Sequence, residues 1–165
     1  MTAGQICDAV AAYYAAKLAQ HGATARGVDW NSPESQHLRF DQLLKLLPPQ
    51  GGALIDYGCG YGALLSYLRT KHIAARYQGF DIAPEMVACA RQTHAGASNC
   101  SFVDVESELE AAEYAVASGI FNVRMDFSND EWQSYVLNIL QRLSRLSIYD
   151  MPPGLLPRVS SHQNS

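Results

Sequence analysis

The chain has 165 residues, which is enough for one domain with a substantial core. Apolar residues make up 48% of it and charged residues 17%, a composition typical of a folded protein and not of a disordered one. There are 12 Lys and Arg residues against 16 Asp and Glu, so the formal net charge is −4, which argues against a protein that grips nucleic-acid phosphates with a basic face. No apolar run approaches the roughly 20 residues that would span a bilayer.

Cysteine usage and the first residues indicate a cellular compartment. The four cysteines, Cys7, Cys59, Cys89 and Cys100, include no CxxC pair and have no histidine at zinc-finger spacing. Residues 1–10 have no basic region ahead of an apolar stretch, so they do not resemble a secretory signal. We therefore expect reduced thiols, no metal site and a cytoplasmic protein.

The N-terminal part is predicted to be helical. Residues 5–20 are rich in Ala and have the apolar spacing of a helix, which a glycine then ends. A second helix is expected to begin at Ser32 or Ser35, either of which can cap it, and to continue to Leu47. Residues 1–50 are therefore expected to form an N-terminal helical cap.

From residue 51 onward, predicted strands and helices alternate. Short apolar runs bounded by turn residues indicate strands, stretches with the 3.6-residue period indicate helices, and Asn129 or Asp130 is expected to cap the last helix. This spacing implies parallel strands joined by right-handed crossovers. The expected fold class is therefore α/β: a Rossmann-like, open, mainly parallel sheet with helices on both faces, over residues 51–146. The predicted strands are 53–55, 77–82, 100–105 and 114–118, and the predicted helices are 63–72, 84–94 and 131–146.

The sequence after the last helix departs from that of a complete sheet. Pro152 and Pro153 follow Leu146 in the stretch where a fifth central strand would come, and proline is rare in central strands. We therefore expect a sheet that is incomplete at its C-terminal end and an irregular tail over residues 147–165. An incomplete sheet leaves one edge exposed, which predicts self-association through that edge.

A glycine-rich turn lies between the first predicted strand and its helix, where an open α/β sheet binds its ligand. It reads Asp56-x-Gly58-x-Gly60-x-Gly62, and the glycines let the backbone turn sharply and come close to a ligand. Asp81 ends the second strand, in the place where an acid accepts both hydroxyls of an adenosine ribose. A tight turn without a ligand is the alternative interpretation, which the neighbouring strand and Asp81 make the weaker one.

Two kinds of nucleoside cofactor fit this layout. The stretch from Gly58 to Ala63 also satisfies the loose dinucleotide fingerprint G-x-G-x-x-A, so a nicotinamide- or flavin-dependent oxidoreductase is one hypothesis. Asp56 favours a different cofactor, because its carboxylate would repel a pyrophosphate and attract an ammonium or a sulfonium. The turn also follows about fifty residues of helical sequence, whereas a dinucleotide-binding domain usually opens with it.

Three motifs, in this order, resemble the signature of the class I S-adenosylmethionine-dependent methyltransferases. They are the glycine turn with Asp56, the stretch Gly79-Phe80-Asp81-Ile82 and the stretch Phe102-Val103-Asp104. The resemblance covers about residues 27–146 and implies S-adenosylmethionine as the cofactor.

The resemblance also assigns a part of the cofactor to each motif. The methionine end would lie on the glycine turn, the ribose at the acid after the second strand, and the adenine at residues after the second and third strands. In that order the implied residues are Asp56 and the backbone at Gly58 and Gly60 for the methionine end, Asp81 for the ribose, Asp104 for the adenine amino group, and Ile82 and Val105 for packing against the ring. Cys59, within the same turn, is a further cofactor-binding candidate. Ser118, at the end of the fourth strand, is a further candidate lining residue.

Arg39 is a candidate from the N-terminal part. The segments 27–32 and 35–40 resemble the cap of some small-molecule and bacterial surface-sugar methyltransferases. We hypothesise that Arg39 pairs with the carboxylate of the cofactor, because a guanidinium binds a carboxylate through two hydrogen bonds. A surface arginine without a ligand is the alternative, and a complex with Arg39 far from that carboxylate would exclude the hypothesis.

The leading functional hypothesis is a methyltransferase that acts on a small-molecule acceptor, such as a sugar or another metabolite. Methyl transfer needs mainly alignment of the acceptor and exclusion of water, and no residue is assigned as catalytic. Two alternatives stay open: the nicotinamide- or flavin-dependent oxidoreductase, and a truncated, catalytically inactive methyltransferase-like protein. A nucleic-acid or membrane partner is not expected.

Overall fold

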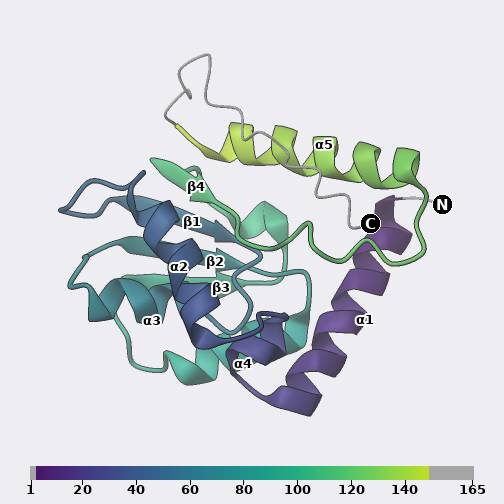
Figure 1. Cartoon of the computed structure of the whole chain (residues 1–165). Coiled ribbons are helices and arrows are strands. Elements are labelled where there is room, and N and C mark those ends of the chain that lie inside the picture. Colours follow the sequence, from purple (N-terminus) through teal and green to yellow (C-terminus); the bar gives the residue numbers. More distant parts are fainter. Residues whose placement is uncertain (1–2, 149–165) are drawn as a thin grey trace.

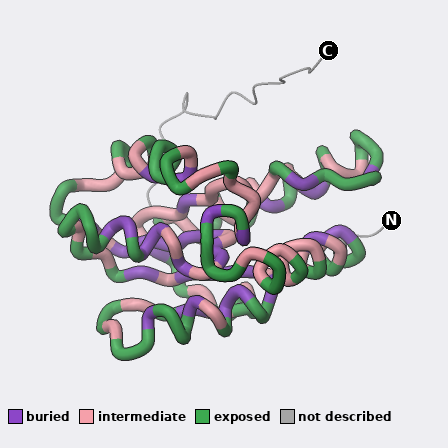
Figure 2. The backbone as a smooth tube through the Cα atoms, turned by 60° about the horizontal axis from the view of Figure 1, so that its bottom comes forward, coloured by how far each residue is buried: buried purple, intermediate pink, exposed green. Residues whose placement is uncertain are grey.

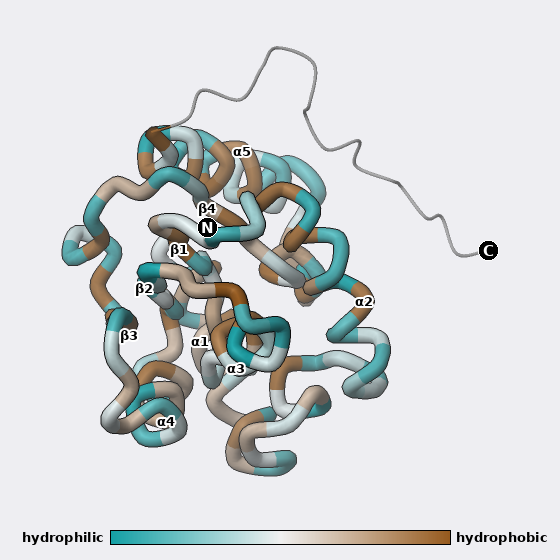
Figure 3. Tube along the Cα trace, turned by 90° about the vertical axis from the view of Figure 1, so that its left-hand side faces the viewer, coloured by the Kyte–Doolittle hydropathy of each residue, from teal (hydrophilic) through white to brown (hydrophobic). Residues whose placement is uncertain are grey.

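A four-stranded parallel sheet organises residues 3–148, which are the residues that the computed structural model describes (Figure 1). The strand order is β3-β2-β1-β4, so β1 and β2 are central. Figure 3 shows this order, with α5 beyond β4. The sheet confirms the predicted α/β class with parallel strands. The strands are β1 (Ala53–Tyr57), β2 (Arg76–Phe80), β3 (Cys100–Val103) and β4 (Tyr114–Val116).

Helices cover both faces of the sheet. Side chains of α2, α3 and α4 pack on one face in one hydrophobic cluster, and side chains of α1 and α5 pack on the other face in a second cluster. Two short 3-10 helices, η1 and η2, lie in the connections. The α-helices are α1 (Ala3–His21), α2 (Pro33–Leu44), α3 (Ala63–Thr70), α4 (Pro84–Thr93) and α5 (Asn129–Leu146), and the short helices are η1 (Ala25–Val28) and η2 (Glu106–Glu108).

The central strand β1 is buried on both sides. All of its residues are buried, as expected for an inner strand of a parallel sheet. Leu54 belongs to the cluster with α2, α3 and α4, whereas Ala53, Ile55 and Tyr57 belong to the cluster with α1 and α5. Side chains alternate between the faces because a strand has a period of two. Figure 2 shows the same burial on the strands and on the inner sides of the helices.

Parallel pairing brings the carboxyl ends of the strands to one edge of the sheet. Tyr57 at the end of β1 pairs with Phe80 at the end of β2, and Phe80 pairs with Val103 at the end of β3. On the other side of β1, Asp56 pairs with Val116 at the end of β4. The segments that follow the strands therefore start side by side, and this places the predicted motifs near each other.

Serine residues cap two helices. Ser32 begins α2 in a reciprocal capping box, which confirms one of the two predicted caps. The cap of α5 is Ser128, so the prediction of Asn129 or Asp130 was wrong by one or two residues. Ser128 has the extended backbone of a cap, its Oγ accepts the amide of Glu131 (3.4 Å), and the Glu131 carboxylate accepts the Ser128 amide (3.0 Å).

The ends of the predicted strands and of most predicted helices differ from the observed ones by no more than two residues, and two larger differences lie in the N-terminal part. Residues 25–28, which lie between the two predicted N-terminal helices, form η1, which Thr24 caps through the amide of Gly27. The helix α2 ends at Leu44 and not at Leu47. The chain continues in tight turns towards Pro48, whose ring disfavours helical backbone at the residue before it.

The segment that leads into β4 carries a single parallel bridge to the chain after α5. The amide of Ala112 donates to the carbonyl of Leu146 (2.9 Å), and the amide of Ile148 donates to the carbonyl of Ala112 (2.8 Å). Within residues 3–148 the sheet otherwise ends at β4. The rest of the predicted tail lies outside the described residues. The domain limits at residues 50 and 146, like the self-association through the sheet edge, stay predictions.

Replacing Ser128 by Ala is expected to lower the free energy of unfolding by about 1 kcal/mol, because the amide of Glu131 loses its capping acceptor. Urea unfolding followed by circular dichroism measures the change. Asp130→Ala is the matched control, and it should cost only a few tenths of a kcal/mol through the helix dipole. Equal losses in the two variants would contradict the assignment of Ser128 as the cap.

Candidate functional site

The glycine turn between β1 and α3 is held by the end of β2. The carbonyl oxygen of Phe80 accepts hydrogen bonds from the amides of Gly58 (2.7 Å) and Cys59 (2.9 Å). The amide of Gly60 donates to Oδ2 of Asp81 over 2.8 Å. Two neighbouring strands therefore fix the turn, and the turn and Asp81 line one pocket.

Asp81 is a buried carboxylate with hydrogen-bonding capacity to spare. Only 9% of its surface is exposed, and it accepts the backbone amides of Gly60 (2.8 Å) and Ala83 (2.9 Å). An ionised carboxylate has about four lone-pair directions, so about two stay available for donors on a ligand. Burial raises the pKa of Asp81 to about 6, although both amides act in the opposite direction. Asp81 is therefore largely ionised at neutral pH and can accept ligand hydroxyls.

Asp56 is the second carboxylate in the pocket. It is 3% exposed, and it accepts a hydrogen bond of 2.5 Å from the hydroxyl of Tyr77. Burial raises the pKa of Asp56 to about 7, while the Tyr77 hydroxyl lowers it and the charge of Asp81 adds to the increase. A positive charge bound in the pocket would favour the ionised form of Asp56, because opposite charges stabilise each other most where water is excluded.

The walls of the pocket come from segments that lie far apart in the sequence. α1 contributes Tyr14, the loop after η1 contributes Trp30, α2 contributes Gln36 and Phe40, and α5 contributes Tyr135. Among the described residues that line the pocket there is no Lys, Arg or His. The walls are therefore mainly apolar and aromatic around two carboxylates, which favours a cationic ligand over an anionic one.

The segment after β4 packs directly on the glycine turn. A methyl group of Ile120 lies against Gly58, where a Cβ would collide with it, and Gly58 has a left-handed φ of 84°. A Cβ on Gly119 would lie 3.1 Å from the ring of Trp30. Gly58 is therefore required both by its backbone conformation and by the close approach of Ile120. Ser118 precedes this contact and lines the pocket.

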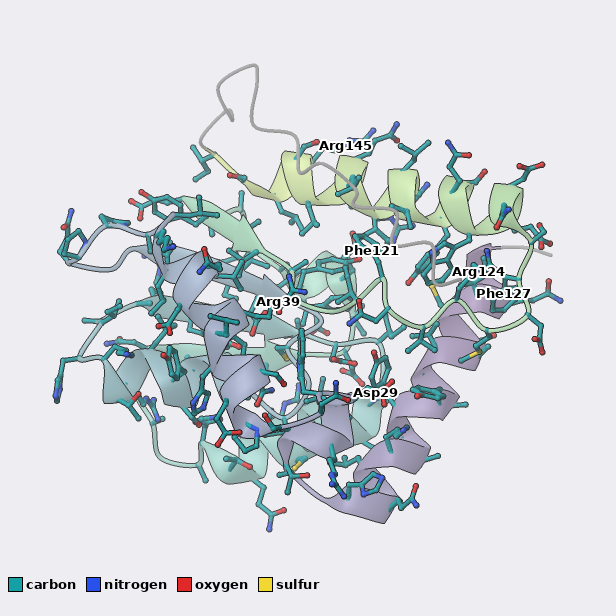
Figure 4. All side chains as sticks on the ribbon, in the orientation of Figure 1. Asp29, Arg39, Phe121, Arg124, Phe127 and Arg145 are labelled. Carbon is teal, nitrogen blue, oxygen red and sulfur yellow. The ribbon has the colours of Figure 1, made fainter. Side chains whose placement is uncertain are left out.

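The structure brings most of the predicted cofactor-binding residues together, but Asp104, Val105 and Arg39 lie outside the pocket lining. Asp104 and Val105 are exposed after β3, Val105 by 48%. Arg39, labelled in Figure 4, is an exposed residue of α2, and its guanidinium lies 5.9 Å from the ring centre of Trp30, which itself lines the pocket. The roles of all these residues stay predictions. The predicted cofactor-binding residues that do line the pocket are Asp56, Gly58, Cys59, Gly60, Asp81, Ile82 and Ser118.

Sequence reasoning did not find the aromatic walls. Tyr14 and Tyr135 occur at the apolar spacing of core-facing helix positions, and this pattern does not distinguish a core from a pocket. Trp30 and Gln36 lie in the segments that resemble the methyltransferase cap, which was the one available signal. Gln36 is only 5% exposed and forms a side-chain hydrogen bond with Tyr61.

Other kinds of site find no support in the described part of the chain. Within residues 3–148, no three His, Cys, Asp or Glu side chains gather as a metal site would require. All four cysteines are free, and burial raises the pKa of Cys59 well above its ordinary value, so this pocket residue is a neutral thiol. None of the helices in the same range combines the length and the apolar composition needed to cross a membrane.

Comparison with known proteins identifies the family. A family model described as a methyltransferase domain matches residues 54–145, which is more than half of the chain. The chain belongs to this family, the class I S-adenosylmethionine-dependent methyltransferases, which confirms the resemblance seen in the three motifs. Rv1506c of Mycobacterium tuberculosis, provisionally named a methyltransferase, is 41% identical over 92 residues. These residues are 56% of this chain and 55% of Rv1506c, so the match spans about half the length of the curated relative.

Solved methyltransferases share the fold at low sequence identity. Phosphoethanolamine N-methyltransferase 1 of Haemonchus contortus, solved with phosphoethanolamine and S-adenosylhomocysteine, has a TM-score of 0.58 and 18% identity, over 85% of this chain and 30% of that one. Magnesium protoporphyrin IX methyltransferase of Synechocystis PCC 6803, solved with S-adenosylmethionine, has a TM-score of 0.51 and 20% identity, over 68% and 55% of the two chains. At such identities the likeness concerns the fold alone.

The two buried carboxylates predict how stability depends on pH. The pKa of an aspartate in an unfolded chain is about 3.9, and burial raises the folded values to about 7 for Asp56 and about 6 for Asp81. Folding therefore favours the protonated forms. Their contribution to stability is fully present below about pH 4 and is lost as the pH rises through the folded values.

Asp56→Asn is expected to remove much of this dependence. Between pH 5 and pH 7.5, the free energy of unfolding of the ligand-free wild type should fall more steeply than that of the variant, as measured by urea unfolding at several pH values. The exposed Asp8→Asn serves as the matched control and should keep the slope of the wild type. Identical slopes for wild type and Asp56→Asn would contradict the raised pKa.

Proposed function

We propose that this chain binds S-adenosylmethionine in the pocket at the carboxyl edge of the sheet and transfers its methyl group to a small-molecule acceptor. The observation that carries the proposal is Asp81, a buried carboxylate fixed by two backbone amides, next to the glycine turn and with lone pairs left for ribose hydroxyls. Membership of the methyltransferase family supports the same cofactor.

The residues of the pocket fit this cofactor in charge as well as in position. The sulfonium and the ammonium of S-adenosylmethionine are cations, and the pocket lining includes Asp56 and Asp81 but, within the described residues, no basic side chain. The glycine turn would hold the methionine end and Asp81 the ribose. Asp104 and Val105 follow β3, the strand next to β2, and we retain them as proposed adenine contacts.

Bound S-adenosylmethionine would supply an electrophilic methyl group, and the protein would hold the acceptor in line and keep water away. The aromatic walls formed by Tyr14, Trp30 and Tyr135 suit that exclusion of water. Burial raises the pKa of the Tyr14 and Tyr135 hydroxyls, so both stay protonated and do not act as bases. No residue is assigned as a general base.

Calorimetric titration with S-adenosylhomocysteine tests the cofactor site. We expect binding by the wild type and a loss of at least about tenfold in affinity for Asp81→Asn, because the amide no longer offers a charged acceptor to two hydroxyls. Asp130→Asn, an exposed aspartate on α5, is the matched control, and NADH is the control ligand. Binding of NADH instead, or unchanged affinity in a folded Asp81→Asn variant, would overturn the assignment. Transfer itself is measured with radiolabelled S-adenosylmethionine and a panel of hydroxyl, amine and sugar acceptors.

The proposed role of Arg39 can be separated from that of the rest of the pocket. If Arg39 pairs with the carboxylate of the cofactor, Arg39→Gln should weaken binding of S-adenosylhomocysteine by about tenfold. The variant should leave the affinity for 5′-methylthioadenosine unchanged, since that ligand has no carboxylate. Arg145→Gln, in the last turn of α5 and away from Arg39 in Figure 4, is the control. Equal weakening for both ligands would show that Arg39 acts by supporting Trp30 instead.

A further inference from the structure

His94 joins three parts of the fold behind the glycine turn. It follows α4, and only 7% of its surface is exposed. Nε2 of its ring lies 3.0 Å from the carbonyl oxygen of Gly62, and Nδ1 lies 3.4 Å from a guanidinium nitrogen of Arg69 on α3. The ring stacks on Phe102 of β3, with 5.4 Å between centroids and 20° between planes. His94 does not line the pocket, so it is not a contact for the ligand.

The partners of the imidazole determine which nitrogen carries its proton. A carbonyl oxygen only accepts and a guanidinium only donates. The ring therefore donates from Nε2 to Gly62 and accepts at Nδ1 from Arg69, which is the neutral Nε2–H tautomer. Burial lowers the pKa of His94, and the charge of Arg69 lowers it further, while the hydrogen bond to Gly62 acts in the opposite direction.

Gly62 is the end of the glycine turn and the N-cap of α3. Its φ of 83° is left-handed, and a Cβ at this position would lie 2.7 Å from Nε2 of His94. Its carbonyl also accepts the amide of Ser66, the first backbone hydrogen bond of α3. Position 62 therefore requires glycine for two reasons: its left-handed backbone conformation and the close approach of the imidazole.

The turn is consequently held at both of its ends. At the start, Phe80 accepts the amides of Gly58 and Cys59, and Asp81 accepts that of Gly60. At the end, the imidazole of His94 hydrogen-bonds to the carbonyl oxygen of Gly62, and its stacking on Phe102 connects this end of the turn to α4 and β3. Without the hydrogen bond from His94, the conformation of the last residues of the turn would be held by the hydrogen bonds within the turn and within α3.

We infer that His94 is a positioning residue of the methyltransferase, whose neutral imidazole fixes the end of the glycine turn in the conformation that binds the cofactor. The inference rests on the proposed function, because the turn is the proposed site of the methionine end. His94 acts through the carbonyl of Gly62 and not through any contact with the reacting groups.

Three substitutions at His94 test this role. Gln can place its amide nitrogen where Nε2 lies and donate to Gly62, whereas Asn is too short to reach it and Leu has no donor. Affinity for S-adenosylhomocysteine should fall roughly tenfold in His94→Leu and His94→Asn and stay within about threefold of wild type in His94→Gln. His72→Asn, at an exposed histidine after α3 whose left-handed φ of 56° asparagine tolerates, is the matched control for His94→Asn.

Two spectroscopic readouts in the ligand-free protein complete the test. Nitrogen-15 spectra of the ring should show the neutral Nε2–H tautomer at pH 7. The rate of amide hydrogen exchange at Gly60 and Gly62 should rise in His94→Leu and His94→Asn, relative to that of amides in α5. In His94→Gln the rate should return to that of the wild type. A structural role in overall stability alone would quicken exchange everywhere.

The outcomes separate this inference from the proposed function. If the wild type does not bind S-adenosylhomocysteine, the proposed function fails, and the exchange data still decide whether His94 fixes the turn. If the wild type binds and His94→Asn binds equally well, the inference alone fails. An Nδ1–H tautomer, or a folded His94→Gln variant as weak as His94→Asn, would overturn it as well.

Discussion

The hydrogen bond from the Gly60 amide to the Asp81 carboxylate is the interaction on which the site depends. It joins the turn after β1 to the residue after β2, and it exists because the two strands are parallel and paired in register up to Tyr57 and Phe80. The same carboxylate accepts the amide of Ala83, at the start of α4. One buried carboxylate therefore orients the turn and accepts an amide at the start of a helix, and the same residue lines the pocket.

Burying two carboxylates costs folding free energy and makes the pocket favour a cationic ligand. The raised pKa values of Asp56 and Asp81 reflect the loss of water around each charge, and the folded protein compensates only in part, with the Tyr77 hydroxyl and two backbone amides. A bound cation would complete this compensation, because no described residue of the lining brings a positive charge. The property that weakens the ligand-free fold at neutral pH is thus the one that suits the site to a sulfonium.

The N-terminal segment takes part in the site as much as the sheet does. Ile6 and Val10 of α1 pack in the same cluster as Ile55 of β1, and Tyr14, further along the same helix, reaches the pocket. The loop after η1 places Trp30 against Gly119, after β4. The pocket therefore closes only when segments from both ends of the described chain meet over the glycine turn.

The sequence by itself determined the parallel α/β fold, the order of its elements and, to within two residues, the ends of its strands, because apolar periodicity and glycine turns are local properties of the chain. It therefore predicted Asp56, the glycine turn and Asp81, whose positions follow from their places at or just after the ends of β1 and β2. The tertiary structure decided the rest: the walls of Tyr14, Trp30 and Tyr135, the exposure of Asp104 and Val105, and the contact of His94 with Gly62. These depend on contacts between segments tens of residues apart, for which helical spacing gives the same pattern whether a side chain meets a core, a pocket or a turn.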